Sequence, residues 1–273
     1  MGAQRTRSGT RTAWTRSPGG CVQGVQTFER AECFLRDLSE IATEEDLAEA
    51  LAEVTREMGF TYFALSHHGD IRRSLQPAIR LHNYPDDWAD YYDDNSLGVS
   101  DPVFRASHLT SVGFAWSEIP NMIDLTPDDH AILERAERKG ISNGFTVPAH
   151  VPGESQGSCS FASPAGVSIH EDKLPLAQLI GAFGFEAARR LWRVRAPAAR
   201  RLPKLTERQR ECILWVGRGK SDWEISRILG VKQDTVARHV KQARERYGVG
   251  KRTMLAVHAL FEGSISFTDI LRR

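Results

Sequence analysis

The side chains best suited to binding chemistry are three aromatic residues spaced four apart. Tyr84, Trp88 and Tyr92 would share one face of a helix, because residues four positions apart on a helix are neighbours. Asp101 and Trp116 follow them in the sequence. Phenol O–H and indole N–H groups need hydrogen-bond partners when they are buried, and a carboxylate beside them needs donors. Together these residues predict an apolar pocket that binds a neutral, polar head group.

Each part of this pattern also has a purely structural explanation. Aromatic residues at helical spacing are common in protein cores, and Asp101-Pro102 is a common turn sequence. The combination favours a ligand site. A hydrogen bond to the Asp101 carboxylate would contribute about 1.5–3 kcal/mol, and leaving this carboxylate unpaired would cost at least as much. We therefore expect the empty domain to pack poorly and ligand binding to be coupled to folding.

Signals for helices and strands around these residues predict a mixed α and β domain. Apolar residues at helical spacing follow Thr43 as far as Gly59, and a strand-like run of aromatic and apolar residues occupies 60–66. Pro85 marks the start of a helix that runs to about residue 94. Further expected elements are a helix over 127–139 ended by Gly140, two strands within 144–162 around Pro152-Gly153, and a long helix over 173–193. This order lacks the regular βαβ alternation of a doubly wound sheet.

Composition and charge divide the 273-residue chain into parts. Residues 1–26 carry arginines among Gly, Ser and Thr without apolar periodicity, so we expect a flexible tail. A ligand-binding domain would span 27–193, followed by an Arg- and Pro-rich linker at 194–203. Residues 204–273 hold 15 Lys and Arg against 8 Asp and Glu, whereas the preceding residues hold 21 against 27. A small basic module behind an acidic body suggests nucleic-acid binding by that module, although charge alone also fits two ordinary domains.

The basic module has the sequence pattern of a helix-turn-helix. Thr206 and Ser221 each stand three residues before a Gln or Glu, as in the capping box that begins a helix. Gly230 would end the second helix, and a third helix would cover 232–247. The inward residues of that third helix would be Val236, Val240 and Ala243. Two short helices around a glycine turn suit the DNA major groove, and a basic helical packing module without DNA function is the alternative.

Short matches to a known family run along this module. They are Leu205-Thr206, Arg208, Gly219-Lys220-Ser221, Glu224-Ile225, Ile228-Leu229, Thr235-Val236, His239, Ala243 and Val249. In these residues the module resembles the C-terminal DNA-binding domain of LuxR-type transcription regulators, with Gln209 in place of the usual Glu. The resemblance implies an all-α, four-helix domain that binds double-stranded DNA as a homodimer and works with RNA polymerase. The DNA contacts it implies are Lys232, Gln233, Thr235, Ala237, Arg238 and Lys241.

The front part of the chain carries a second set of matches. The order and spacing of Trp88, Tyr92, Asp101, Pro102, Trp116 and Gly144, continued through Pro148 and Gly157 to Ser160, resemble the acyl-homoserine-lactone-binding domain of quorum-sensing LuxR regulators. The resemblance spans about residues 27–193 and implies an α+β fold, an α-β-α sandwich around an antiparallel sheet. The chain would then be a quorum-sensing transcription regulator that binds an acyl-homoserine lactone and recognises an inverted-repeat promoter site as a dimer.

The same resemblance implies a role for each site residue. Trp88 N–H would bind the lactone carbonyl, and Asp101 would accept the ligand amide N–H. Tyr92 and Ser160 would bind the acyl carbonyl, Tyr84 would lie beside the head group, and Trp116 with Pro102 would form the wall around the lactone. Gly144 would be structural, allowing a backbone turn or close packing of strands.

Other function classes are less well supported by the residues. An enzyme that opens the lactone with Asp101 as base would be expected to carry a clustered metal-ligand motif, which the chain lacks, or a G-x-S-x-G elbow between a strand and a helix. The two G-x-S-x-G matches in the sequence, at 140–144 and 153–157, lie instead between an expected helix and an expected strand and between two expected strands. A phosphorylation-controlled regulator would need an acidic cluster in a receiver domain, whereas Glu44-Glu45-Asp46 begins a helix. An antagonist that does not bind DNA is disfavoured by the basic third helix. A LuxR-type regulator that answers to a different small molecule remains the main alternative.

Cysteine spacing and hydropathy set further expectations. Cys21, Cys33, Cys159 and Cys212 form no C-x-x-C pair, so we expect reduced thiols, no metal and no cofactor. The chain has no apolar run of about 18–20 residues and no signal-peptide centre at its start, so we expect a cytoplasmic protein with no membrane partner.

Overall fold

The computed structural model describes residues 18–68, 78–151, 156–195 and 204–271. Residues 1–17 of the expected tail, residues 196–203 of the expected linker and the Pro152-Gly153 turn lie outside the described residues. A five-stranded sheet in the order β2-β1-β5-β4-β3 organises the first domain, and all its strand pairs are antiparallel. Its strands are β1 (Tyr62–His67), β2 (Arg80–His82), β3 (Phe114–Ala115), β4 (Asn143–Ala149) and β5 (Gly157–Ser163).

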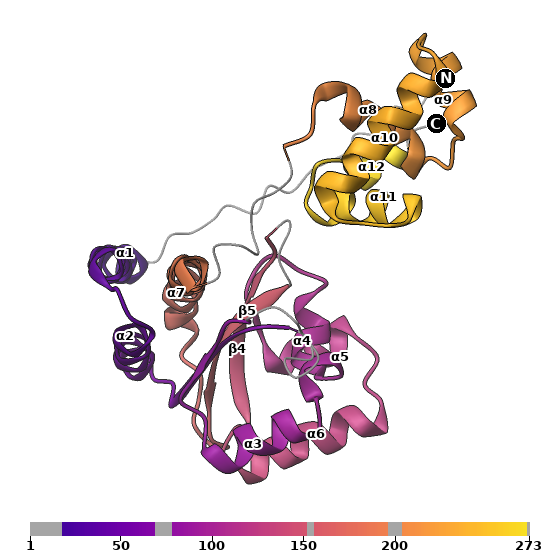
Figure 1. The fold of residues 1–273 in the computed structure, drawn as a ribbon. Coiled ribbons are helices and arrows are strands. Elements are labelled where there is room, and N and C mark those ends of the chain that lie inside the picture. Colours follow the sequence, from indigo (N-terminus) through magenta and orange to yellow (C-terminus); the bar gives the residue numbers. More distant parts are fainter. Residues whose placement is uncertain (1–17, 69–77, 152–155, 196–203, 272–273) are drawn as a thin grey trace, which may run out of the picture.

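Helices cover both faces of this sheet (Figure 1). One face packs against α2 (Glu44–Glu57) and α7 (Leu174–Arg195), and α1 (Pro18–Glu40) packs on α7. The other face carries α3 (Asp86–Asp94), α4 (Pro102–Ser107), α5 (Ile119–Met122) and α6 (Pro127–Arg138). The α-β-α sandwich around an antiparallel sheet is therefore confirmed.

Local signals explain where the predicted helices begin and end. The Thr43 side chain accepts a hydrogen bond from Asp46 N at 3.1 Å and caps α2. The chain leaves α2 at Gly59, where φ is +88°, a conformation that favours glycine. Leu47, Leu51 and Val54 are fully buried, as their spacing predicts.

The start of α1 differs from expectation. The helix begins at Pro18, so residues 18–26 are helical rather than part of a flexible tail. The later turns of α1 pack against α7, and their side chains Ala31, Phe34 and Leu38 are buried. Because helix extension adds one backbone hydrogen bond per residue once a nucleus exists, the packed turns can extend α1 into a segment without apolar periodicity.

The C-terminal domain consists of helices alone. They are α8 (Glu207–Gly217), α9 (Asp222–Leu229), α10 (Gln233–Tyr247), α11 (Arg252–Phe261) and a short fifth helix, α12 (Phe267–Leu271), that packs on α8. The capping boxes at Thr206 and Ser221 are both formed, and Gly230 ends α9 at φ +66°. The inward residues of α10 are buried as expected: Val236, Val240 and Ala243. In the described part of the chain, no helix combines the length and apolar character needed to cross a bilayer.

Two glycines of α7 differ in how much space a methyl group would have in their place. A Cβ at Gly181 would lie 2.7 Å from Val147 Cγ2 and 2.8 Å from its Cβ. A Cβ at Gly184 would lie 3.0 Å from Leu51 Cδ2, a terminal methyl group of α2, and at least 3.8 Å from its other neighbours. Gly181 therefore sets the distance between α7 and β4, whereas a methyl group at Gly184 needs a shift of only a few tenths of an ångström.

This difference predicts opposite effects of the same substitution on one helix. Gly181→Ala should lower the free energy of unfolding by about 1–2 kcal/mol, because overpacking against Val147 outweighs the gain in helix propensity. Gly184→Ala should leave stability unchanged or raise it by up to about 1 kcal/mol. Urea denaturation of both variants beside the wild type measures this. Equal stability of the two variants would mean that Gly181 does not hold α7 close to β4.

Candidate functional site

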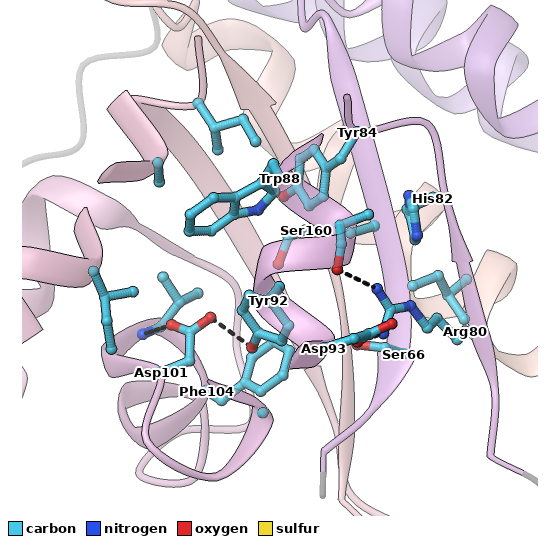
Figure 2. Close-up of a pocket in the computed structure, with 18 of the residues that line it drawn as sticks. Ser66, Arg80, His82, Tyr84, Trp88, Tyr92, Asp93, Asp101, Phe104 and Ser160 are labelled. Carbon is cyan, nitrogen blue, oxygen red and sulfur yellow. Dashed lines mark hydrogen bonds and ion pairs between the residues drawn. The ribbon is translucent and has the colours of Figure 1, made fainter. Parts of the chain in front are cut away.

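A cavity lies between the sheet and the helices of the α3–α6 face. About 100 Å³ is open to the centre of a water-sized sphere, and its lining includes Tyr84, Trp88, Tyr92, Asp101, Trp116 and Ser160. On that scale one water needs about 10–15 Å³, so the space would hold several waters or a small polar head group. Figure 2 shows Trp88, Tyr92, Asp101 and Ser160 around this space. The structure thus brings together residues that are up to 76 positions apart in the sequence.

Helix α3 presents the aromatic residues to the cavity. It follows Pro85, and Trp88 is 5% exposed while the acidic residues of its first turn, Asp86 and Asp87, face solvent. Tyr92 lies one turn after Trp88, with a distance of 5.9 Å between ring centroids and an angle of 62° between the ring planes. Tyr84 immediately precedes the helix and also lines the cavity. The three aromatic residues spaced four apart therefore pack in the core and also line the cavity.

The Asp101 carboxylate is buried and already hydrogen-bonded. It caps α4, since its Oδ1 accepts from Val103 N at 2.7 Å, and its Oδ2 accepts from the Tyr92 hydroxyl at 2.8 Å. Burial raises the pKa of Asp101, and these hydrogen bonds oppose that rise. The expectation that an empty site leaves this carboxylate unpaired is therefore wrong, because Tyr92 and the helix backbone supply donors within the protein.

Tyr92 is held as a donor toward Asp101. Burial raises the pKa of Tyr92 well above its usual value, and the neighbouring Asp101 carboxylate raises it further. The phenol therefore stays protonated at neutral pH and donates a hydrogen bond to Asp101. Phe104 packs against the other side of Tyr92, with 6.1 Å between ring centroids.

A chain of hydrogen bonds joins Trp116 to Ser160. The indole N–H of Trp116 donates to Thr146 Oγ1 at 2.8 Å, and Thr146 Oγ1 lies 2.8 Å from Ser160 Oγ. Because Thr146 accepts from Trp116, its own hydroxyl hydrogen can point to Ser160, which leaves the Ser160 hydrogen available to the cavity. The sequence did not identify Thr146, since its place beside Ser160 depends on the pairing of β4 with β5.

Gly144 is explained by its contact with Trp116. A Cβ at this position would lie 2.4 Å from Trp116 Cε2. Gly144 pairs with Ala162 in the sheet, and its φ is not positive. The two roles expected for Gly144 were a backbone turn and close packing of strands, whereas its place in the structure is explained by the close approach of the Trp116 ring.

Pro102 is placed differently from its expected role. It is the first residue of α4 and is buried, but it does not belong to the cavity lining. Its neighbours Asp101 and Val103 do line the cavity. Pro102 therefore acts on the site through the helix start that it fixes.

Several lining residues were not identified from the sequence. Ser66, Arg80, His82 and Phe104 line the cavity. The pairing of Ala64 with His82 and of Ser66 with Arg80 places side chains from β1 and β2 on one face of the sheet. Strand β2 has only three residues, too few for an alternating pattern to be recognised. Within the described ranges, no group of three or more His, Cys, Asp or Glu side chains could hold a metal ion.

A basic surface lies on α10 of the C-terminal domain. Its exposed members among the expected DNA contacts are Lys232, Gln233, Ala237, Arg238 and Lys241. Thr235 is half-buried, and the Lys241 side chain is 77% exposed. The side chains that α10 buries lie on its opposite face, so the exposed set can meet a groove without disturbing the core.

Comparisons with known proteins agree with this architecture. Residues 43–191 match the family described as autoinducer binding domain, and residues 203–259 match bacterial regulatory proteins of the luxR family. The regulator RpaR of Rhodopseudomonas palustris, described as quorum sensing-dependent, is 31% identical over 76% of this chain and 83% of its own length. The HTH-type regulator y4qH of Sinorhizobium fredii is 28% identical over 73% of this chain, and the match spans 61% of that protein.

Solved structures share the fold. Escherichia coli SdiA superposes with a TM-score of 0.64 at 22% identity, covering 90% of this chain and 99% of that one. A structure of SdiA in complex with octanoyl-rac-glycerol gives a TM-score of 0.62 at 20% identity, covering 88% and 96%. The chain is therefore a transcription regulator of the LuxR family, with an autoinducer-binding domain followed by the LuxR-type helix-turn-helix domain.

Proposed function

We propose that the autoinducer of this regulator is an N-acyl-homoserine lactone that binds in the cavity beside Asp101. The observation that supports this most is a buried carboxylate that faces a small cavity lined by indole and phenol groups. An amide N–H is a suitable donor for such a carboxylate, and an indole N–H suits a lactone carbonyl. In this proposal Trp88 binds the lactone carbonyl, Tyr84 lies beside the head group and Trp116 forms the wall.

Tyr92 would change its partner when the ligand binds. Its single hydroxyl hydrogen points to Asp101 Oδ2 in the empty site. A ligand amide N–H can take over on the carboxylate, and Tyr92 can then donate to the acyl carbonyl together with Ser160. The exchange leaves the Asp101 carboxylate and the Tyr92 hydroxyl each with a partner before and after binding, so the empty domain does not need the ligand to satisfy Asp101.

The C-terminal domain would read DNA through α10. We propose that residues 204–273 act as a homodimer on an inverted repeat, with half-sites about one helical turn apart, and cooperate with RNA polymerase. Residues 27–193 would form the ligand-binding unit and 194–203 the connection between the two. Lys232, Arg238 and Lys241 supply the positive charge of the exposed α10 surface.

Substitution of Asp101 tests the proposed binding of the head group. Asp101→Asn should weaken binding of N-hexanoyl-L-homoserine lactone by about 10- to 150-fold. The Asn side chain is a weaker, uncharged acceptor, and its own NH₂ group would have to face either the backbone N–H of Val103 or the amide N–H of the ligand. Isothermal titration gives the dissociation constant directly. Asp90→Asn is the matched control, since Asp90 is an exposed carboxylate of α3 and should leave binding unchanged.

A second ligand class is tested in the same titration. Octanoyl-rac-glycerol has no amide N–H, so a ligand of this type would not use Asp101 in the proposed way. An unchanged dissociation constant for the lactone in Asp101→Asn would contradict the assigned role of Asp101. Tight binding of octanoyl-rac-glycerol with no binding of any homoserine lactone would replace the proposed ligand class.

The next prediction concerns DNA. Lys241→Ala should weaken binding to a site selected in vitro with the wild-type protein. Loss of about 1–3 kcal/mol with relaxed preference at one base pair would indicate a base contact, and a uniform loss with a shallower salt dependence would indicate a phosphate contact. Gel-shift titrations at two salt concentrations, on the selected site and on a scrambled duplex, measure both.

The control for charge is Arg138→Ala. Arg138 is an exposed cation of α6 in the ligand-binding domain, and its removal changes the net charge by the same amount. DNA affinity of Lys241→Ala equal to that of the wild type on both duplexes and at both salt concentrations would remove Lys241 from the recognition surface.

A further inference from the structure

The end of the cavity away from the aromatic head-group residues is polar. Figure 2 shows Ser66, Arg80 and Asp93 gathered on the side away from Trp88. All three line the cavity, as does His82. An acyl chain that leaves Tyr92 and Ser160 would extend toward this end, so its far atoms would meet these groups rather than an apolar wall.

Strand register explains the position of these groups on the cavity floor. Ser66 pairs with Arg80 and Ala64 pairs with His82, while Ala64 also pairs with Ser160 on the other side. Paired residues in an antiparallel sheet point to the same face. The small side chains at positions 64, 66 and 160 leave the space open, and the longer side chains of β2 border it.

An ion pair borders this end. The Arg80 guanidinium contacts the Asp93 carboxylate of α3, and Arg80 Nη2 also donates to the Ala89 carbonyl at 3.4 Å. The side chains are 22% and 36% exposed, so part of the pair faces open space. An alkyl chain that covered this ion pair would displace the water bound to it without supplying a hydrogen bond in return, which is unfavourable.

His82 adds an unsatisfied group. Its Nδ1 is buried and has no hydrogen-bond partner within the described structure, although its ring stacks on Tyr84 at 6.0 Å between centroids. Burial lowers the pKa of His82, with a contribution from Arg80, so the imidazole is neutral at neutral pH and can donate or accept. A ligand in the cavity would meet the rest of this ring, since Nδ1 itself is not accessible.

From these observations we propose that the acyl part of the ligand is short and ends in a hydroxyl group, which binds among Arg80, Asp93, Ser66 and His82. A hydroxyl donates and accepts, so it can accept from the guanidinium while it donates to the carboxylate or to the imidazole. This inference rests on the proposed function, because it assumes that a homoserine lactone occupies the head-group end.

The wild-type protein tests the inference with three ligands. They are the homoserine lactones with hexanoyl, ω-hydroxyhexanoyl and dodecanoyl chains, and isothermal titration gives each dissociation constant. The ω-hydroxyhexanoyl ligand should bind at least about tenfold more tightly than the hexanoyl ligand, the size expected for one well-formed hydrogen bond to a charged group. The dodecanoyl ligand should bind most weakly.

Removal of the ion pair should reverse this order. In the double variant Arg80→Met with Asp93→Leu, the hexanoyl ligand should bind more tightly than its ω-hydroxy counterpart. The matched control is Arg30→Met with Glu57→Leu, which removes an ion pair of similar exposure between α1 and α2 on the opposite face of the sheet. The single variant His82→Phe keeps the ion pair and should reduce the preference for the hydroxyl severalfold.

The results separate the proposed ligand class, a homoserine lactone, from the proposed terminal hydroxyl of its acyl chain. Tightest binding of the dodecanoyl ligand by the wild type, or an equal preference for the hydroxyl in wild type and in both cavity variants, would overturn this inference while leaving a lactone as the ligand. Binding of none of the three lactones would overturn the proposed function and this inference with it. If the double variant does not fold, the wild-type series and His82→Phe still decide.

Discussion

The ligand-binding domain depends on how it satisfies one buried carboxylate. Asp101 stands where the chain enters α4 and faces an aromatic cavity, so its charge requires donors from within the protein. The backbone N–H of Val103 supplies one, and the hydroxyl of Tyr92 supplies another from α3. The two short helices are therefore joined through the site, and any ligand that donates to Asp101 must enter this existing arrangement.

The sheet opposite the helices gives the cavity its shape and its direction. Gly144 admits the Trp116 ring, whose N–H is used by Thr146, and Thr146 in turn lies against Ser160. In this arrangement Trp116 and Ser160 both line the cavity, and the Ser160 hydroxyl can donate into it. The same register places Arg80 and His82 beyond Ser160, so polarity continues across the floor from the head-group end to the far end.

The features that could be predicted from the sequence are those that depend on residues close together in the chain. Helix α3 and the starts of α2, α8 and α9 depend on contacts within four residues, and spacing and capping residues indicate them. Thr146 lies beside Ser160, and Arg80 and His82 line the cavity, because of strand pairings between residues 14 to 96 positions apart, which no local pattern specifies. Helix α1 was not predicted, because its last turns are fixed by packing on α7 and its first turns, assigned to a flexible tail, carry no apolar signal. The pairing of Asp101 with Tyr92 was missed for a different reason, since both residues were identified but assigned to a ligand alone.

The most direct measurement is a double-mutant cycle between Asp101 and the ligand amide. The cycle compares N-hexanoyl-L-homoserine lactone with its ester analogue, in which oxygen replaces the amide N–H, in the wild type and in Asp101→Asn. If Asp101 accepts the amide hydrogen, replacing N–H by oxygen should weaken binding to the wild type strongly and to the variant little, a coupling of about 1.5–3 kcal/mol. Equal losses in both proteins would show that Asp101 and the amide do not interact and would contradict the account of this site.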